Sequence, residues 1–144
     1  MENEDTIKLL KECDAGSKMA VSSIDEVLDK ISNDKMMDIL KESKSHHEKL
    51  CTEIHSLLSE NNSEEKEPNP IAKGMSWLKT NIKVGVDKND STIADIMIDG
   101  CNMGVKSLNR YLNQYKNANE PSKKICDRLI TIEEKLCRDL KCYL

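Results

Sequence analysis

The chain contains very few aromatic residues: among its 144 residues there is no Phe, one Trp and three Tyr. A buried core therefore has to be aliphatic, built from Leu, Ile, Val and Met. A chain of this length can bury a core of useful size within one domain. We expect a single domain that covers residues 1–144.

The charge pattern argues against several classes of protein. Charged residues make up 33% of the chain, the net charge is −4, and no basic stripe occurs, which argues against a nucleic-acid partner. No apolar run is long enough to span a membrane. The first residues, Met1 to Asp5, are acidic and lack the apolar centre of a signal peptide, so we expect a cytoplasmic protein.

The six cysteines form no Cys-x-x-Cys pair, so zinc ribbons and thioredoxin-like sites have no support in the sequence. In a chain without a signal peptide we expect reduced thiols that are buried as small hydrophobic side chains. The sequence also has no glycine-rich phosphate loop and no nucleophile elbow. These absences favour a protein that is not an enzyme.

Four long segments carry apolar residues at spacings of three and four, which is the spacing of one helix face. These segments are residues 5–32, 35–60, 91–117 and 121–144. A shorter amphipathic segment at 71–84 follows a charged loop. The pattern predicts an all-α protein with four long helices and one short helix.

The connections between the helices predict the topology. The turn at Ser32 to Asp34 is short, so the first two helices should be antiparallel neighbours. The link between the second and third long helices is long enough to run back along the bundle. We therefore expect a ferritin-like four-helix bundle, with a long crossover between helices two and three that carries the short extra helix.

Several short motifs accompany this pattern. They are Leu9-Leu10-x-x-x-Asp14, His47-Glu48-x-Leu50, Gly74-x-x-Trp77-Leu78-Lys79 and Leu108-x-x-Tyr111. In their order and spacing the chain resembles an uncharacterised bacterial family of the ferritin-like superfamily, a domain of unknown function. The resemblance covers most of the chain. It implies the bundle fold, dimers and no established activity.

Polar residues interrupt the apolar stripes near the middle of the first two helices, where ferritin-like bundles place metal ligands. A di-iron centre needs a carboxylate on each of two helices and a Glu-x-x-His pair on each of the other two. Asp14 matches the first carboxylate. The second helix has no Glu-x-x-His pair, because Lys44 lies three residues before His47 and Ser43 three before His46.

The third and fourth helices depart from the di-iron pattern as well. Met103 and Gly104 occupy the height at which the second carboxylate belongs. In the fourth helix the nearest fragment is Glu134-x-x-Cys137, which contains no His. We therefore do not expect an intact di-iron oxidase.

Two interpretations of His47 remain. In the first it is a neutral core histidine hydrogen-bonded to Asp14, Ser17 or Tyr111, because buried polar groups need partners. In that case Glu133 and Glu134 lie on the solvated face of the fourth helix. In the second it belongs to a weaker site for iron or manganese. The candidate metal ligands are Asp14, His47, Glu133 and Glu134.

The cysteines can be compared by their depth in the expected bundle. If helices two and three start from the same end, Cys13 and Cys51 lie about 15 Å along the axis from Cys101 and Cys137. This separation argues against a four-thiolate metal site. Cys101 and Cys137 remain thiol candidates, and a redox role for this pair is a third hypothesis.

Our principal hypothesis is a non-catalytic ferritin-like bundle without a cofactor, which acts through assembly or through binding an unidentified protein partner. The alternative is a metal-binding or redox protein with a degenerate site at mid-bundle. Apolar positions outside the main stripes favour a homodimer, although they could instead lie beneath the segment around Trp77. These positions are Leu9, Val27, Ile39, Leu58, Ile98 and Ile130.

Overall fold

The computed structural model describes residues 3–61 and 89–144. Within these ranges it contains four α-helices, a short terminal 3-10 helix and no strand, so the all-α class and the four long helices are confirmed. The elements are α1 (Glu4–Leu28), α2 (Asp34–Glu60), α4 (Asp90–Gln114), α5 (Glu120–Leu140) and η1 (Lys141–Tyr143). The expected crossover and its short helix at 71–84 lie outside the described residues. No helix in the described ranges is long and apolar enough to cross a membrane.

Each α-helix begins after an asparagine whose side chain accepts a hydrogen bond from the backbone N–H three residues later. The cap satisfies one of the free donors of the first turn, and an acidic residue at the next position complements the helix dipole. The caps are Asn3, Asn33, Asn89 and Asn119. The second and third long helices begin at Asp34 and Asp90, one residue before the predicted starts at 35 and 91, because the capping asparagine lies earlier.

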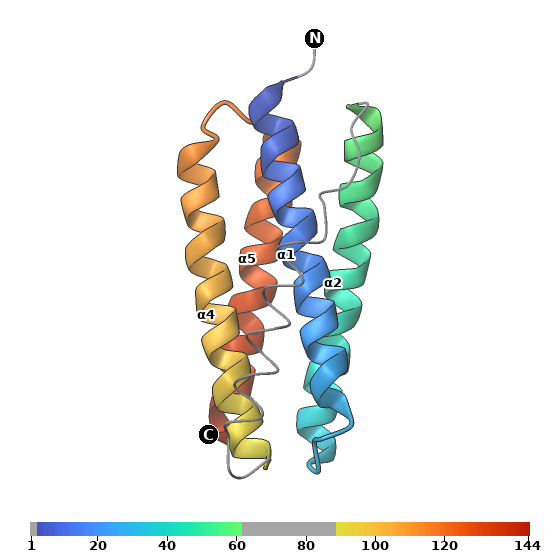
Figure 1. The fold of residues 1–144 in the computed structure, drawn as a ribbon, viewed down its shortest axis with the longest axis vertical. Helices are drawn as coiled ribbons and strands as arrows, with labels where there is room; N and C mark the ends of the chain where they lie inside the picture. The colour runs from blue at the N-terminus through green and yellow to red at the C-terminus, as the bar shows by residue number, and fades with distance from the viewer. Residues whose placement is uncertain (1–2, 62–88) are drawn as a thin grey trace.

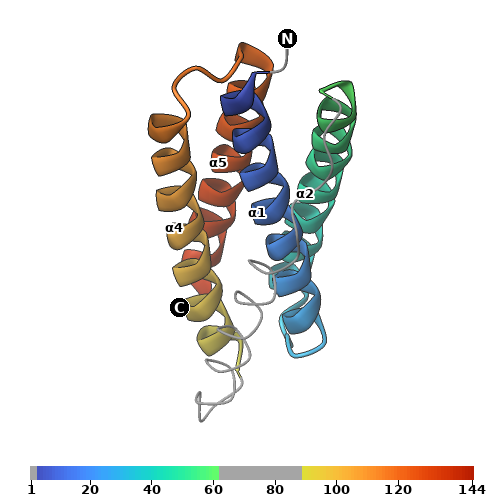
Figure 2. The ribbon, with the colours of Figure 1, turned by 45° about the horizontal axis from the view of Figure 1, so that its top comes forward.

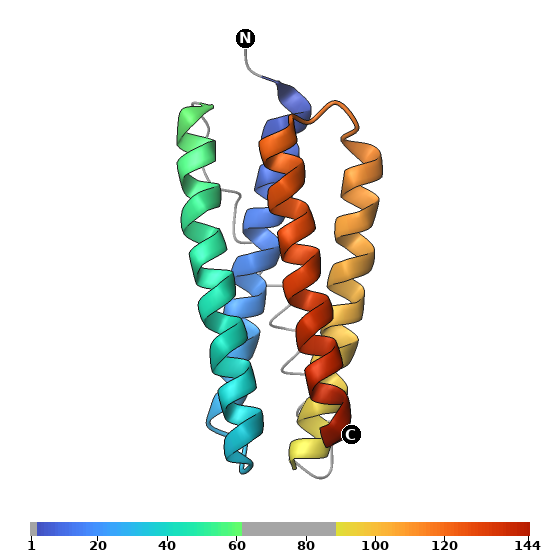
Figure 3. The same ribbon diagram turned by 180° about the vertical axis from the view of Figure 1, so that it is seen from behind.

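Helices α1 and α5 run in one direction, and α2 and α4 run in the other (Figure 1). Hydrogen bonds at both ends of the bundle establish this order. The Asp90 carboxylate accepts from the backbone N–H groups of Ser32 and Asn33, both at 2.9 Å, so α4 begins beside the α1–α2 turn. At the other end, Asp5 accepts from the backbone N–H of Asn117 at 3.0 Å, which fixes the α4–α5 loop beside the start of α1. Helix α5 lies behind α1 and α4 in Figure 2 and in front in Figure 3.

The buried side chains form two apolar clusters, one toward each end of the bundle. One contains Ile24, Met36, Leu40 and Leu140, and the other contains Leu10, Leu50, Ile54 and Leu129. No aromatic side chain of the described residues is among the buried ones, which confirms the aliphatic core. Between the clusters lies a polar layer, the waist, formed by Asp14, Ser17, Ser43, His47 and Glu133.

Candidate functional site

The centre of the waist is a bond between α2 and α5. Nε2 of His47 lies 2.8 Å from Oε1 of Glu133, and Nδ1 of His47 lies 2.8 Å from the backbone oxygen of Ser43, one turn earlier in α2. The His47 side chain is fully buried, and Glu133 is 8% exposed. The pair therefore bridges two helices in an environment almost without water.

The geometry determines how many protons this pair holds. A backbone oxygen only accepts, so Nδ1 of His47 carries a hydrogen and donates it to Ser43. Nε2 and a carboxylate oxygen at 2.8 Å need one further proton between them. Whether that proton is on the imidazole or on Glu133, the pair as a whole is neutral, and His47 does not use the second carboxylate oxygen, Oε2.

Asp14 belongs to a separate polar group on the α1–α2 side of the waist. Its Oδ1 lies 2.9 Å from Nε2 of His55, and its Oδ2 lies 3.0 Å from the Lys18 ammonium. Asp14 is fully buried, whereas its two partners are partly exposed. The carboxylate is thus held by cationic or donor groups at the bundle edge and does not join His47.

The Cys101 thiol lies beside Glu133 at the waist. Burial and the neighbouring carboxylate raise the pKa of Cys101 far above its ordinary value, so this side chain stays a protonated thiol. Cys137 lies close by and donates a hydrogen bond to Oδ1 of Asn102 at 3.5 Å. Both cysteines are free. A thiol that resists deprotonation is a poor nucleophile, which weakens the redox hypothesis for this pair.

A second cysteine pair was not anticipated from the sequence. Cys13 of α1 and Cys126 of α5 are both fully buried. A hydrogen bond with Cys126, together with burial, raises the pKa of the Cys13 thiol well above its ordinary value. These two thiols act as small packing residues of the core.

Helices α1 and α4 face each other across a groove whose floor is formed by α5. The groove has a volume of about 230 Å³. Small residues widen it on both sides, and they are Ala15, Gly16, Ala20, Ser23, Gly100, Gly104 and Ser107. A Cβ atom built at Gly100 would meet nothing within 4 Å. The glycines of α4 therefore leave open space and do not bring a neighbouring helix into close contact.

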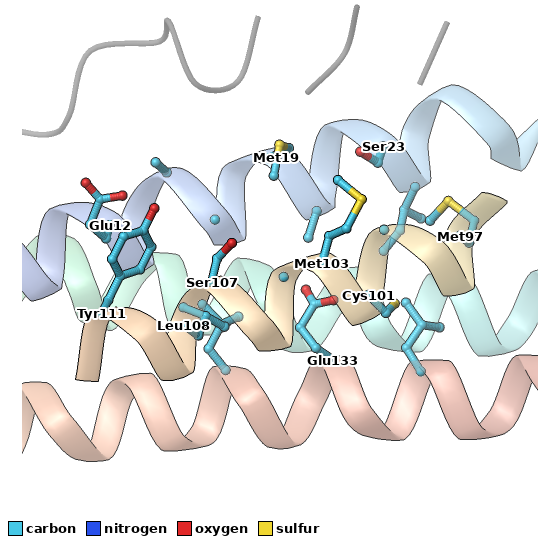
Figure 4. Close-up of a pocket in the computed structure, with 18 of the residues that line it drawn as sticks. Glu12, Met19, Ser23, Met97, Cys101, Met103, Ser107, Leu108, Tyr111 and Glu133 are labelled. Atoms are coloured by element: carbon cyan, nitrogen blue, oxygen red, sulfur yellow. The ribbon is translucent and has the colours of Figure 1, made fainter. Parts of the chain in front are cut away.

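The groove joins the waist through Glu133. In Figure 4 the Glu133 side chain extends from α5 toward the space between α1 and α4, beside Cys101. A Cβ atom at Gly104 would lie 3.7 Å from Oε2, the oxygen that His47 does not occupy. At one end of the groove Tyr111 hydrogen-bonds Glu12, and burial followed by this carboxylate raises the pKa of the Tyr111 phenol. The groove thus combines apolar walls with a buried carboxylate.

The structure separates the four candidate metal ligands. It brings together only His47 and Glu133, while Asp14 pairs with His55 and Glu134 is exposed. In residues 3–61 and 89–144, no three His, Cys, Asp or Glu side chains are grouped so that they could hold a metal ion. The expected partners of His47 were also wrong, because Ser43 and Glu133 take its two ring nitrogens.

Glu133 was expected on the solvated face of the last helix, and the structure places it in the interior. The signal was present in the sequence, because Leu129, Glu133, Leu136 and Leu140 follow one another at spacings of four, three and four. Ile132 also fits the apolar spacing between Leu129 and Leu136, but it is only half-buried, whereas Glu133 is buried. His55 carried no comparable signal, because its role depends on the height at which α2 passes Asp14.

Comparison of the chain with protein-family models, curated proteins and solved structures found no match in any of the three.

Proposed function

We propose that this chain is a non-catalytic bundle of the ferritin-like arrangement that acts by binding a small apolar partner in the groove between α1 and α4. The observation that carries this proposal is the groove itself, about 230 Å³ in volume and lined mainly by apolar and small side chains. Ligand sites are typically apolar concavities with a few convergent polar groups. Since apolar cavities of about 150 Å³ hold benzene in other proteins, there is room here for a ligand of roughly ten heavy atoms.

The polar groups at the groove support binding more than catalysis. Oε1 of Glu133 is occupied by His47, which is itself anchored to the backbone of α2. The Cys101 thiol, whose pKa is strongly raised, offers no thiolate. A nucleophile with an adjacent free base is the usual requirement for covalent catalysis, and neither component faces the groove in an active form.

The alternative function, a metal or redox site that uses iron or manganese at mid-bundle, has less support. It would require Asp14 to leave His55 and Lys18 and approach His47 across the waist. Elemental analysis of protein purified without chelator checks this alternative directly. A stoichiometric transition metal that is lost in the His47→Leu variant would favour the metal site over the binding groove.

Binding in the groove can be tested with a neutral, environment-sensitive apolar dye. We expect saturable binding to the unmodified chain and its loss in Gly100→Leu, because Gly100 lines the groove and a Cβ atom added there meets nothing within 4 Å. Asn113→Leu is the matched control, because this residue is on the same helix and exposed. Binding that is absent from the unmodified chain, or equal in both variants, would contradict the proposal.

A homodimer in the cytoplasm is a further part of the proposal, and the apolar positions that favoured it give it little support. Leu9, Val27, Leu58 and Ile98 are buried within the chain. Ile39 and Ile130 are half-buried. The large hydrophobic side chains exposed in the described ranges are Met103 and Leu144. Light scattering coupled to size exclusion measures the oligomeric state, and a single mass of one chain would contradict a dimer.

A further inference from the structure

Glu133 is the polar group that a ligand in the groove would contact near its middle. The chemistry of this side chain indicates the class of ligand. Resting on the proposed function, we infer that the groove selects an apolar amine, whose ammonium group donates to Oε2 of Glu133 while its hydrocarbon body lies along α1 and α4. Oε1 is held by His47 at 2.8 Å, and this bond fixes the direction of the second oxygen.

The polar groups along the groove favour a ligand that donates hydrogen bonds. Among the described residues that line it, Glu12 and Glu133 bring carboxyl oxygens, which are acceptors, and none is Lys, Arg or His. Glu12 lies with Tyr111 at one end, and Glu133 lies near the middle (Figure 4). A ligand with a carboxylate head would bring a second acceptor to Oε2 of Glu133, whereas an ammonium group can donate a hydrogen bond to it.

The burial of Glu133 makes this contact selective. The side chain is only 8% exposed, so an ammonium group at Oε2 displaces little water and is screened little by solvent. Hydrogen bonds with an ionised donor are roughly twice as strong as neutral ones. Oε2 accepts in either arrangement of the proton shared with His47, so the acceptor does not depend on where that proton lies.

The apolar walls of the groove can accommodate hydrocarbon chains of different shapes. Three methionines, Met19, Met97 and Met103, line it, and their unbranched side chains adapt to different apolar surfaces. Gly100 also lines the groove and leaves open space there. We therefore expect discrimination between head groups and little discrimination between unbranched and branched hydrocarbon bodies.

Three ligands with the same eight-carbon chain and different head groups test the inference: octylamine, 1-octanol and octanoate. We expect calorimetry at neutral pH to give octylamine the tightest binding, about tenfold tighter than octanol, and octanoate the weakest. In Glu133→Gln the preference for the amine over the alcohol should disappear, while octanol still binds. Glu134→Gln, which changes an exposed neighbour, should leave the preference intact.

The outcomes separate this inference from the proposed function. If octanol binds and octanoate binds as tightly as octylamine, the groove is a binding site but the inference about the head group is wrong. If none of the three binds, both the inference and the proposed function fail. The comparison of head groups on the unmodified chain decides between these outcomes even if Glu133→Gln does not fold.

Discussion

The His47–Glu133 pair predicts a large energetic coupling between α2 and α5. Removing one member of a buried, hydrogen-bonded pair typically costs 3–5 kcal/mol, because the remaining group is left without a partner. For His47→Leu we expect the lower end, about 3 kcal/mol, because the stranded Glu133 has slight access to the groove. Glu133→Leu should cost less, about 1–3 kcal/mol, because a neutral imidazole is cheaper to bury unpaired and Nδ1 keeps its bond to Ser43.

The double variant His47→Leu/Glu133→Leu decides whether this reasoning is right. Replacing both members of a buried pair with apolar residues of similar volume is often neutral or stabilising. We expect the double variant to lie within about 1 kcal/mol of the unmodified chain, so the two single changes should not add. Urea unfolding followed by circular dichroism measures all three free energies, with Glu134→Leu as an exposed control. If the losses of the two single variants sum in the double variant, the pair is not coupled as the structure requires.

Two further predictions concern the groove glycines and the buried thiols. Gly100→Ala and Gly16→Ala should each raise the free energy of unfolding by about 0.5–1 kcal/mol, because alanine favours the helix and neither new methyl group meets an obstacle closer than 3.8 Å; a lower thermal midpoint in either variant would contradict this. The folded state raises the pKa of the Cys13 and Cys101 thiols, so it keeps protons that the unfolded chain releases at high pH. The free energy of unfolding should therefore fall as pH rises above about 9, by up to about 1.4 kcal/mol per pH unit for each thiol. Urea midpoints at pH 7, 9 and 10 check the trend, which should be shallower in Cys101→Ser and would be absent if the thiols titrated normally.

Much of the fold could be predicted from the sequence, because helix periodicity is a local property. The four stripes predicted the four long helices, and the polar interruptions in the first two predicted a polar layer at mid-height, which lies between the two apolar clusters. The first helix ends at Leu28, four residues before the predicted end at residue 32. Asp29 and Lys30 form a turn there, so Ile31, the last apolar residue of the stripe, lies beyond the helix. Asparagine is a strong N-cap residue, so Asn89 in the sequence already indicates that α4 begins at Asp90.

The candidate site could be predicted only in part, because partners across helices depend on relative height and rotation. The sequence singled out His47 and Asp14 correctly as interior residues, and both are fully buried. It offered Asp14 as one of three partners of His47, whereas His47 pairs with Glu133 and Asp14 pairs with His55, about two helical turns farther along α2. The groove could not be predicted at all, because open space between two helices results from what their facing side chains fail to fill.

The two glycines in the middle of α4 give the strongest reason to regard the groove as functional. Glycine inside a helix costs roughly 1 kcal/mol relative to alanine, and Gly100 and Gly104 both lie in regular helix. Neither position needs a glycine to avoid a clash, since an added Cβ would meet nothing at Gly100 and only an ordinary 3.7 Å contact at Gly104. The missing side chain of Gly104 leaves room beside Oε2 of Glu133, and that of Gly100 leaves open space farther along the groove. The chain therefore forgoes helix stability at the place where the groove meets its buried carboxylate, as expected if that space is used to hold a ligand.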